Sequence, residues 1–254
     1  VAERHTVALS GECADEEFGG YPWFERSELL EADTFPWCPD LEFRRAVVKP
    51  ELWESLQVED YVQARYQQSL AEMPALPGEA LWERRRREVG WLSLNWFMST
   101  LLDRKDRMSM AAGLEVRVPF CDHHLVEYVW NIPWAMKAMN GQRKQVLRDA
   151  AEGLLPEELL RRPKSPYPKT HDPLYEQLVR ARLLTILDDR DAPIHSLVDE
   201  TALRAGLLSD AGDYGKPWFG QLMAGPQMLA YLIQINEWMS RYLSLIHISE
   251  PTRR

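Results

Sequence analysis

Hydrophobic residues recur at helical spacing over most of the chain, and they predict a mainly α-helical structure. Two stripes are the clearest, one inside residues 79–112 and one in the last long helix. They consist of Trp91, Leu94, Met98 and Leu101, and of Met228, Leu232, Ile235, Met239 and Tyr242. Both stripes are expected to make core contacts. Further helices are predicted in residues 47–70, 125–130, 142–150, 155–160, 179–187 and 202–208.

One short apolar run near the start of the chain predicts a β-strand. Residues 7–9 are Val-Ala-Leu, and Ser10 and Gly11 end the run. Residues 14–18 have the composition of one or two helical turns, which the glycine pair at residues 19–20 should terminate. The pattern therefore predicts a strand, a turn and a short helix.

Three carboxylates cluster in this turn. Asp15 and Glu16 follow Glu12 by three and four residues, so a helical turn would let all three converge. Gly11 would let ligand atoms approach the backbone, and carboxylate oxygens suit a Mg²⁺–phosphate complex. The alternative is a solvated acidic helix start, which is favourable at a helix N-terminus without any ligand.

Composition and charge narrow the class of protein. Hydrophobic residues make up 45% and charged residues 27% of the 254 residues, as in soluble globular proteins. The net charge of −9 argues against a general nucleic-acid or membrane-surface binder, so the run of arginines at residues 84–87 is interpreted as a solvated helix face. No apolar run approaches the ~20 residues of a membrane-spanning helix. Three cysteines without metal-like spacing favour reduced thiols in the cytoplasm, and His123 and His124 are given no ligand role.

The turn near the start of the chain carries a recognisable motif. It is Ser10-Gly11-Glu12-Cys13-Ala14-Asp15-Glu16-Glu17-Phe18-Gly19-Gly20-Tyr21. This resembles the second nucleotide-site motif of the glutamine-hydrolysing asparagine synthetases. The chain departs from that motif at Cys13, where the family normally has Gly. If the position needs a positive φ angle, Cys13 would carry strain.

Two later segments also resemble the family. Residues 101–111 and 113–122 match its Leu-Leu-x-x-x-Asp-(Lys/Arg)-x-(Ser/Thr)-Met-Ala and Glu-(Val/Ala)-Arg-Val-Pro-Phe-Leu-Asp signatures, except that Cys121 replaces Leu. Lys144 stands four residues before Arg148, where the family carries a lysine. Without the resemblance, Lys144 and Arg148 would be interpreted as a solvated basic edge at a helix start.

The resemblance implies a fold and a reaction. The family belongs to the ATP-pyrophosphatase group, whose α/β fold is similar to that of the adenine-nucleotide α-hydrolases. Its members use ATP and Mg²⁺ to convert aspartate to β-aspartyl-AMP. Ammonia from an N-terminal glutaminase domain then displaces AMP and yields asparagine. The resemblance also implies a cytoplasmic enzyme that forms a homodimer when intact, with no nucleic-acid or membrane partner.

The resemblance further implies roles for individual residues. Glu12 matches the carboxylate that is needed for acyl-adenylate formation and takes a proton from ammonia. Lys144 would stabilise negative charge on the phosphates and point to phosphate instead of to a structural carboxylate. Asp106 matches an acidic residue that lines the same cleft.

The implied nucleotide contacts lie in the first motif. Ser10 and Gly11 match the positions whose backbone contacts ATP, and Asp15 matches a residue beside Mg²⁺–pyrophosphate. Asp15 is therefore the expected metal ligand.

The extent of the match suggests a partial domain. Residues 1–242 are interpreted as part of a synthetase domain, and residues 243–254 as a non-native tail. The Ser-Gly-Gly-x-Asp-Ser pyrophosphate loop and the glutaminase domain are not found in the sequence. The chain alone is therefore expected to be mostly helical, with one short strand that is unpaired or at an edge. It is also expected neither to make asparagine nor to bind ATP tightly.

Three alternatives stay open at this point. A related adenylating enzyme could close a β-lactam, or could amidate another acid. A helical interaction module without catalysis could use the many tryptophans as anchors. The proline-rich residues 161–173 could be a linker or a lid.

Overall fold

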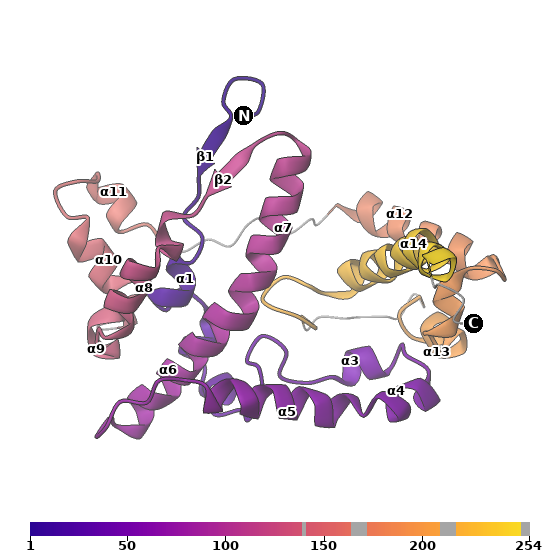
Figure 1. The fold of residues 1–254 in the computed structure, drawn as a ribbon, viewed down its shortest axis with the longest axis horizontal. Helices are drawn as coiled ribbons and strands as arrows, with labels where there is room; N and C mark the ends of the chain where they lie inside the picture. The colour runs from indigo at the N-terminus through magenta and orange to yellow at the C-terminus, as the bar shows by residue number, and fades with distance from the viewer. Residues whose placement is uncertain (139–140, 164–171, 209–216, 250–254) are drawn as a thin grey trace. The chain divides into compact units, whose positions relative to one another are not determined.

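The computed structural model describes residues 1–138, 141–163, 172–208 and 217–249, with side chains up to residue 243. These residues form two compact units, of which each is described by itself. The first contains Val1–Pro36 and Ala64–Pro166, and the second contains Trp37–Gln63 and Tyr167–Arg254. The described chain is mainly helical, as the hydrophobic spacing predicts (Figure 1).

The predicted strand is present, but it is not alone. β1 (Val7–Leu9) pairs in parallel with β2 (Glu115–Arg117), and Ala8 lies opposite Val116. Figure 1 shows the two strands side by side, with α7 (Met98–Ala111) leading into β2. The expectation of a single strand was wrong because the extended segment Glu115–Arg117 supplies a partner for its backbone groups. This two-stranded sheet joins the two segments that carry the first two motifs.

A tight helical turn follows β1. Helix α1 (Ala14–Glu17) is only one turn long, and Gly19 ends it with a φ of 69°. Cys13 precedes the helix with φ 78° and ψ −23°, in the left-handed region. The condition of the prediction for Cys13, a positive φ angle, is therefore met, and a side chain in this region is unfavourable.

An aromatic cluster fixes the end of the first motif to the longest helical segment of this unit. That segment runs through α6 (Leu81–Leu92), the π-helical η2 (Ser93–Phe97) and α7. Trp23 is 1% exposed, stacks on Tyr21 at 4.2 Å and packs edge-on against Phe97 at 5.1 Å. Its indole nitrogen also donates to Ser93 Oγ at 3.3 Å.

The arginine run is not simply a solvated helix face. Arg85 donates to the carbonyls of Leu30 and Ala32. Arg87 pairs with Glu79 at 2.8 Å with only 10% of its side chain exposed. The interpretation of residues 84–87 was therefore wrong at these two positions, because these guanidinium groups satisfy carbonyl and carboxylate oxygens next to the core.

Short helices complete the first unit. They are η1 (Pro22–Phe24), α2 (Ser27–Leu30), η3 (Pro119–Cys121), α8 (His123–Trp130), α9 (Trp134–Lys137), α10 (Gln145–Ala150) and α11 (Glu157–Leu160). Helix α5 (Val58–Ala71) contains the boundary between the two units.

The second unit has its own hydrophobic core, built between α12 (Pro173–Asp188) and α14 (Gly225–Ser249). Leu183, Leu203 and Met228 are each at most 1% exposed in this core. Tyr242 is 51% exposed, so its assignment to the core stripe was wrong. The remaining elements are α3 (Glu42–Arg45), α4 (Pro50–Leu56), η5 (Pro193–Ser196) and α13 (Glu200–Ala205).

The proline-rich segment and the segment interpreted as a tail both lie partly outside the described residues. Most of the proline-rich stretch 161–173 lies outside the described residues. Helix α14 continues to Ser249, into the segment interpreted as a tail. None of the helices in the described part of the chain combines the length and hydrophobicity that crossing a bilayer requires.

Candidate active site

The end of β1 places the first three residues of the motif. The Ser10 backbone N–H donates to the Arg117 carbonyl at 2.9 Å, so β2 fixes the point at which the chain turns away from the sheet. A Cβ atom built on Gly11 would meet no atom within 4 Å. The backbone of Gly11 therefore faces open space, as close approach by a ligand requires.

Lys105 connects two residues of this turn. Its ammonium nitrogen lies 2.7 Å from Ser10 Oγ and 2.9 Å from Glu12 Oε1. Arg104 is more distant from the same carboxylate oxygen, at 3.8 Å. Sequence reasoning missed Lys105 and favoured its neighbour Asp106. The sequence does show a run of charged residues at the end of an apolar helix. That pattern alone does not tell whether Lys105 or Asp106 reaches the turn.

The second oxygen of Glu12 is available for chemistry. Glu12 Oε2 is buried and has no hydrogen-bond partner among the described residues. The side chain of Glu12 is only 16% exposed. A buried carboxylate oxygen without a partner is costly, and such atoms are found where a ligand or a reacting group completes the site.

Asp15 and Lys144 form the second charged contact of the site. Lys144 Nζ lies 2.7 Å from Asp15 Oδ1, and about a quarter of each side chain is exposed. The Lys144 backbone N–H donates to the Phe18 carbonyl at 3.2 Å, which joins the start of α10 to α1. Lys144 was expected to point to phosphate instead of to a structural carboxylate. The structure instead pairs it with Asp15.

Gly20 makes this contact possible. A Cβ atom at Gly20 would lie 1.8 Å from Asp15 Oδ1 and 2.8 Å from Lys144 Cε. Both distances are far below van der Waals contact. Only glycine fits here, because the carboxylate and the lysine stem occupy the space that a side chain would need.

The three carboxylates of the first motif do not act as one cluster. Glu16 is 2% exposed and accepts a hydrogen bond from the Tyr21 hydroxyl at 2.8 Å, whereas Glu12 and Asp15 contact separate lysines. All three surround Tyr21: burial raises the pKa of its hydroxyl, and the charges of Glu16, Asp15 and Glu12 raise it further. The predicted convergence is thus wrong for Glu16, which turns into the core.

Asp106 does not join the contacts of Glu12. It is exposed, and its side chain makes no hydrogen bond or ion pair with the described residues. Arg117 pairs with Glu115 at 2.7 Å on the same strand.

Glu17 and Lys137 are two buried ionisable groups that the sequence did not reveal. Glu17 is 4% exposed, and neither of its carboxylate oxygens has a partner among the described residues. Burial raises its pKa to about 8, although the positive charge of Lys137 opposes the shift. Burial, together with the charge of Arg87, lowers the pKa of Lys137 to about 8. Nothing in the sequence distinguishes Glu17 from its acidic neighbours.

The two cysteines that depart from the family motifs are close to one another. Burial raises the pKa of the Cys13 thiol, and the charge of Glu17 and the nearby Cys121 add to the effect. Burial also raises the pKa of Cys121, while a hydrogen bond with Cys13 lowers it. All three cysteines of the chain are free thiols. These two are therefore poor nucleophiles at neutral pH.

Taken together, the site offers oriented carboxylates and cations around an open glycine backbone. The oxygens of Glu12 and Asp15 are the ligand type that Mg²⁺ prefers. Lys105 and Lys144 supply positive charge for anionic groups. Such an arrangement suits chemistry on a phosphate or an activated carboxylate.

Comparison with known proteins agrees with the motifs. The asparagine synthase family model matches residues 1–240. Glutamine-hydrolysing asparagine synthetase 3 of Bacillus subtilis strain 168 is 50% identical over 242 residues, which is 95% of this chain and 39% of that protein. Synthetase 1 of the same organism is 30% identical over 66% of this chain and 31% of its own length. A glutamine-hydrolysing asparagine synthetase of Mus musculus is 45% identical over 67 residues, 25% of this chain and 12% of its own length. The chain thus spans well under half the length of these relatives, and it belongs to the asparagine synthase family.

Proposed function

We propose that this chain forms part of the synthetase site of a glutamine-hydrolysing asparagine synthetase. In this reaction the side-chain carboxylate of aspartate attacks the α-phosphate of ATP, which gives β-aspartyl-AMP and pyrophosphate. Ammonia released from glutamine then displaces AMP to give asparagine. Family membership supports the proposal, together with the placement of the motif residues.

The observation that carries the proposal is the meeting of three chain segments at one turn. Residues 10–15, Lys105 and Lys144 come from different elements, yet they form two lysine–carboxylate contacts there. An adenylation site needs preorganised positive charge for phosphate oxygens and a carboxylate that can accept a proton. Both are present where these three segments meet.

Glu12 is proposed as the proton acceptor. Lys105 holds one oxygen at 2.9 Å, which orients the carboxylate, while Oε2 remains without a partner among the described residues. When ammonia attacks the activated carbonyl, the new bond leaves an excess proton on nitrogen. Glu12 Oε2 would remove it, as a positioned general base.

The residues of the site fit ATP and Mg²⁺. Open space above Gly11 leaves its backbone accessible to a phosphate. Asp15 would hold the cation, with Glu12 as a second source of oxygen ligands. When bound, Mg²⁺ supplies positive charge that neutralises the pyrophosphate leaving group. The cation would then take the place of Lys144 beside Asp15, and the ammonium group of Lys144 would turn toward phosphate.

The proposed partners are aspartate, ATP and ammonia from a glutaminase domain. A cytoplasmic location agrees with the three free thiols, because reducing compartments keep cysteines unpaired. Among the described residues, no feature favours β-lactam closure, amidation of another acid, or a helical interaction module without catalysis.

The test is ammonia-dependent formation of asparagine from aspartate and ATP by the intact enzyme that contains this chain, and by its Glu12→Gln variant. Gln keeps the shape of Glu12 but cannot accept the proton, so we expect loss of at least about a hundredfold in turnover. Glu115→Gln, on an exposed side chain of β2, is the matched control and should keep full activity. Turnover by Glu12→Gln within a few-fold of the parent would exclude the assigned role. Faster turnover with an acid other than aspartate would identify one of the related adenylating enzymes.

A further inference from the structure

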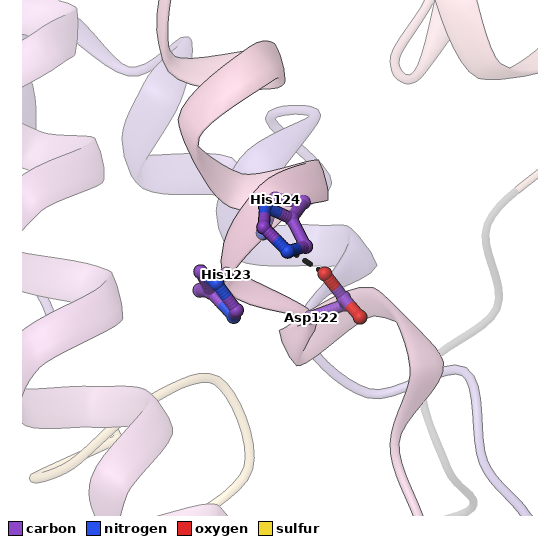
Figure 2. Close-up of side chains that lie close together, drawn as sticks. All are labelled: Asp122, His123 and His124. Carbon is purple, nitrogen blue, oxygen red and sulfur yellow. Dashed lines mark hydrogen bonds between the residues drawn. The ribbon is translucent and has the colours of Figure 1, made fainter.

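A cluster of three potential metal ligands lies at the start of α8, outside the contacts of the proposed active site. Asp122, His123 and His124 each offer one ligand atom, and these atoms all lie within 4.8 Å of one another. Figure 2 shows the three side chains gathered around the first turn of the helix. We propose that this Asp-His-His cluster binds one divalent transition-metal ion of the Zn²⁺ type.

The backbone already holds part of this arrangement in place. The His124 N–H donates to Asp122 Oδ1 at 2.9 Å, which caps the helix and fixes the carboxylate (Figure 2). The other carboxylate oxygen remains for an ion. The two imidazole rings lie with centroids 3.8 Å apart and an angle of 39° between their planes. Adjacent helical residues do not normally face each other, so this closeness is a specific feature of the helix start.

The spacing is compatible with coordination. Zn²⁺ binds imidazole nitrogen and carboxylate oxygen at about 2.0–2.2 Å, so two ligands of a tetrahedral ion lie roughly 3.3 Å apart. All three side chains are exposed. Rotation about their side-chain bonds is enough to bring the ligand atoms to the spacing that the ion requires. Three protein ligands would leave the fourth position to water.

The donor set selects the kind of ion. Two imidazoles and one carboxylate suit Zn²⁺, Ni²⁺ or Cu²⁺, whereas Mg²⁺ and Ca²⁺ prefer oxygen ligands alone. The site would therefore not compete with Asp15 for Mg²⁺. The positive end of the α8 dipole disfavours a cation, and the charge of Asp122 offsets this effect.

The scaffold of the cluster is anchored in the first unit. Phe120, just before the cluster, packs edge-on against Phe18 with centroids 6.1 Å apart. Val129, near the end of α8, is 2% exposed and lies in the same hydrophobic cluster as Phe18. The ligands therefore extend from a fixed helix start, which reduces the entropy lost when an ion binds.

The experiment is titration of the purified protein with Zn²⁺ by calorimetry, and with Co²⁺ by absorption spectroscopy. We expect one ion per chain and a Co²⁺ spectrum without thiolate charge-transfer bands. His123→Gln and His124→Gln should each weaken binding by about tenfold or more, and the double variant should abolish it. Glu127→Gln, an exposed acidic residue of the same helix, is the matched control and should bind as the parent does.

Circular dichroism of each variant separates loss of the ion from loss of the fold. Asp122→Asn adds a second comparison, because Asn can still cap α8 but loses the charge that faces the ion. It should keep the helix and weaken binding. Undiminished Zn²⁺ binding by the double histidine variant, or thiolate bands in the Co²⁺ spectrum, would place the ion elsewhere and overturn the proposal. The absence of any stoichiometric binding by the parent would overturn it as well.

Discussion

The ammonium group of Lys144 lies 2.7 Å from the carboxylate of Asp15, and the missing side chain of Gly20 leaves the space for this contact. Lys144 stands just before α10 in the left-handed conformation, with a φ of 58°. Asp15 belongs to α1. The contact therefore joins the segment that contains Lys144 to the first motif. The positions of both charged groups depend on Gly20.

Gly20→Ala should strongly reduce activity. The new methyl group would lie 1.8 Å from Asp15 Oδ1 and would displace the carboxylate, the lysine or both. A displacement of about 1 Å in a catalytic site can lower turnover by about a hundredfold. The measurement is kcat/KM for aspartate-dependent pyrophosphate release by the intact enzyme that contains this chain.

Gly90→Ala is the matched control for that change. Gly90 lies inside α6, where an added Cβ atom meets nothing within 4 Å. Alanine should stabilise the helix by about 0.5–1 kcal/mol and leave kcat/KM unchanged. Equal kcat/KM for the two alanine variants would show that Gly20 has no role in placing the charges.

Lys144→Ala should lower turnover much more than thermal stability. Loss of one preorganised donor to a transition state typically costs about 3–4 kcal/mol. The Asp15–Lys144 pair is partly exposed, so its loss should change the free energy of unfolding by only about 1 kcal/mol or less. Single-turnover rates and thermal melts of the same preparations measure both effects. A large drop in melting temperature with normal turnover would make Lys144 a structural residue.

Lys105→Met should reduce kcat while leaving the fold intact. Met keeps the length of the side chain but removes the ammonium group that holds Ser10 and Glu12. Loss of a hydrogen bond to a charged group corresponds to about a 10-fold to 100-fold effect. Lys105→Arg should recover part of kcat, since it restores the charge.

Arg104→Met is the comparison for Lys105. Arg104 lies 3.8 Å from Glu12 and 56% of its side chain is exposed, so its removal should have little effect on kcat. If both Met variants behave alike, the general positive charge of this helix matters and the specific contact of Lys105 does not.

The strained position of Cys13 can be tested by comparing two substitutions. Cys13→Gly and Cys13→Ala both remove the buried thiol, but only glycine accepts a φ of 78° without strain. The Gly variant should therefore be more stable than the Ala variant by about 1 kcal/mol in denaturant unfolding. Equal stabilities would mean that the left-handed conformation of Cys13 carries no measurable strain.

Local features of the chain were predictable where a single segment determines them. The strand at residues 7–9, the one-turn helix and its glycine stop follow from hydrophobicity and backbone preferences, and the structure contains them. The positive φ of Cys13 followed from the glycine that the family has at this position. Lys144 was placed beside the first motif only through the resemblance.

Features that depend on contacts between distant segments were not predictable. β2 is three residues long, and its pairing with β1 is visible only after the chain has folded. Lys105, and not Asp106, contacts Glu12 because α7 presents only one of two adjacent charged residues to the turn. Arg85 was interpreted as solvated because it is charged. A guanidinium group can nevertheless be buried where carbonyl oxygens accept its hydrogen bonds.

Glu17 provides the last prediction, a stability that depends on pH. Burial raises its pKa from an ordinary 4.5 to about 8. Between these values the unfolded chain releases the proton and the folded chain keeps it. The contribution of Glu17 to stability is therefore full below pH 4.5 and falls as the pH rises toward 8, by up to about 1.4 kcal/mol per pH unit. Lys137, with a pKa lowered to about 8, acts in the opposite direction and mainly above pH 8.

Glu17→Gln isolates this effect, because Gln cannot ionise. We expect the stability of the variant relative to the parent to increase steadily from pH 5 to pH 7.5, as measured by denaturant unfolding at several pH values. Glu127→Gln, on an exposed side chain of α8, should show no such trend. From pH 5 upward, the carboxyl group of Glu17 is mostly ionised in the unfolded chain but still mostly protonated in the folded chain. Up to pH 7.5, Lys137 stays mostly protonated in both states, because its pKa is about 8. A difference between Glu17→Gln and the parent that stays constant over this range would mean that the buried carboxyl group ionises normally, and that water or another group satisfies its oxygens.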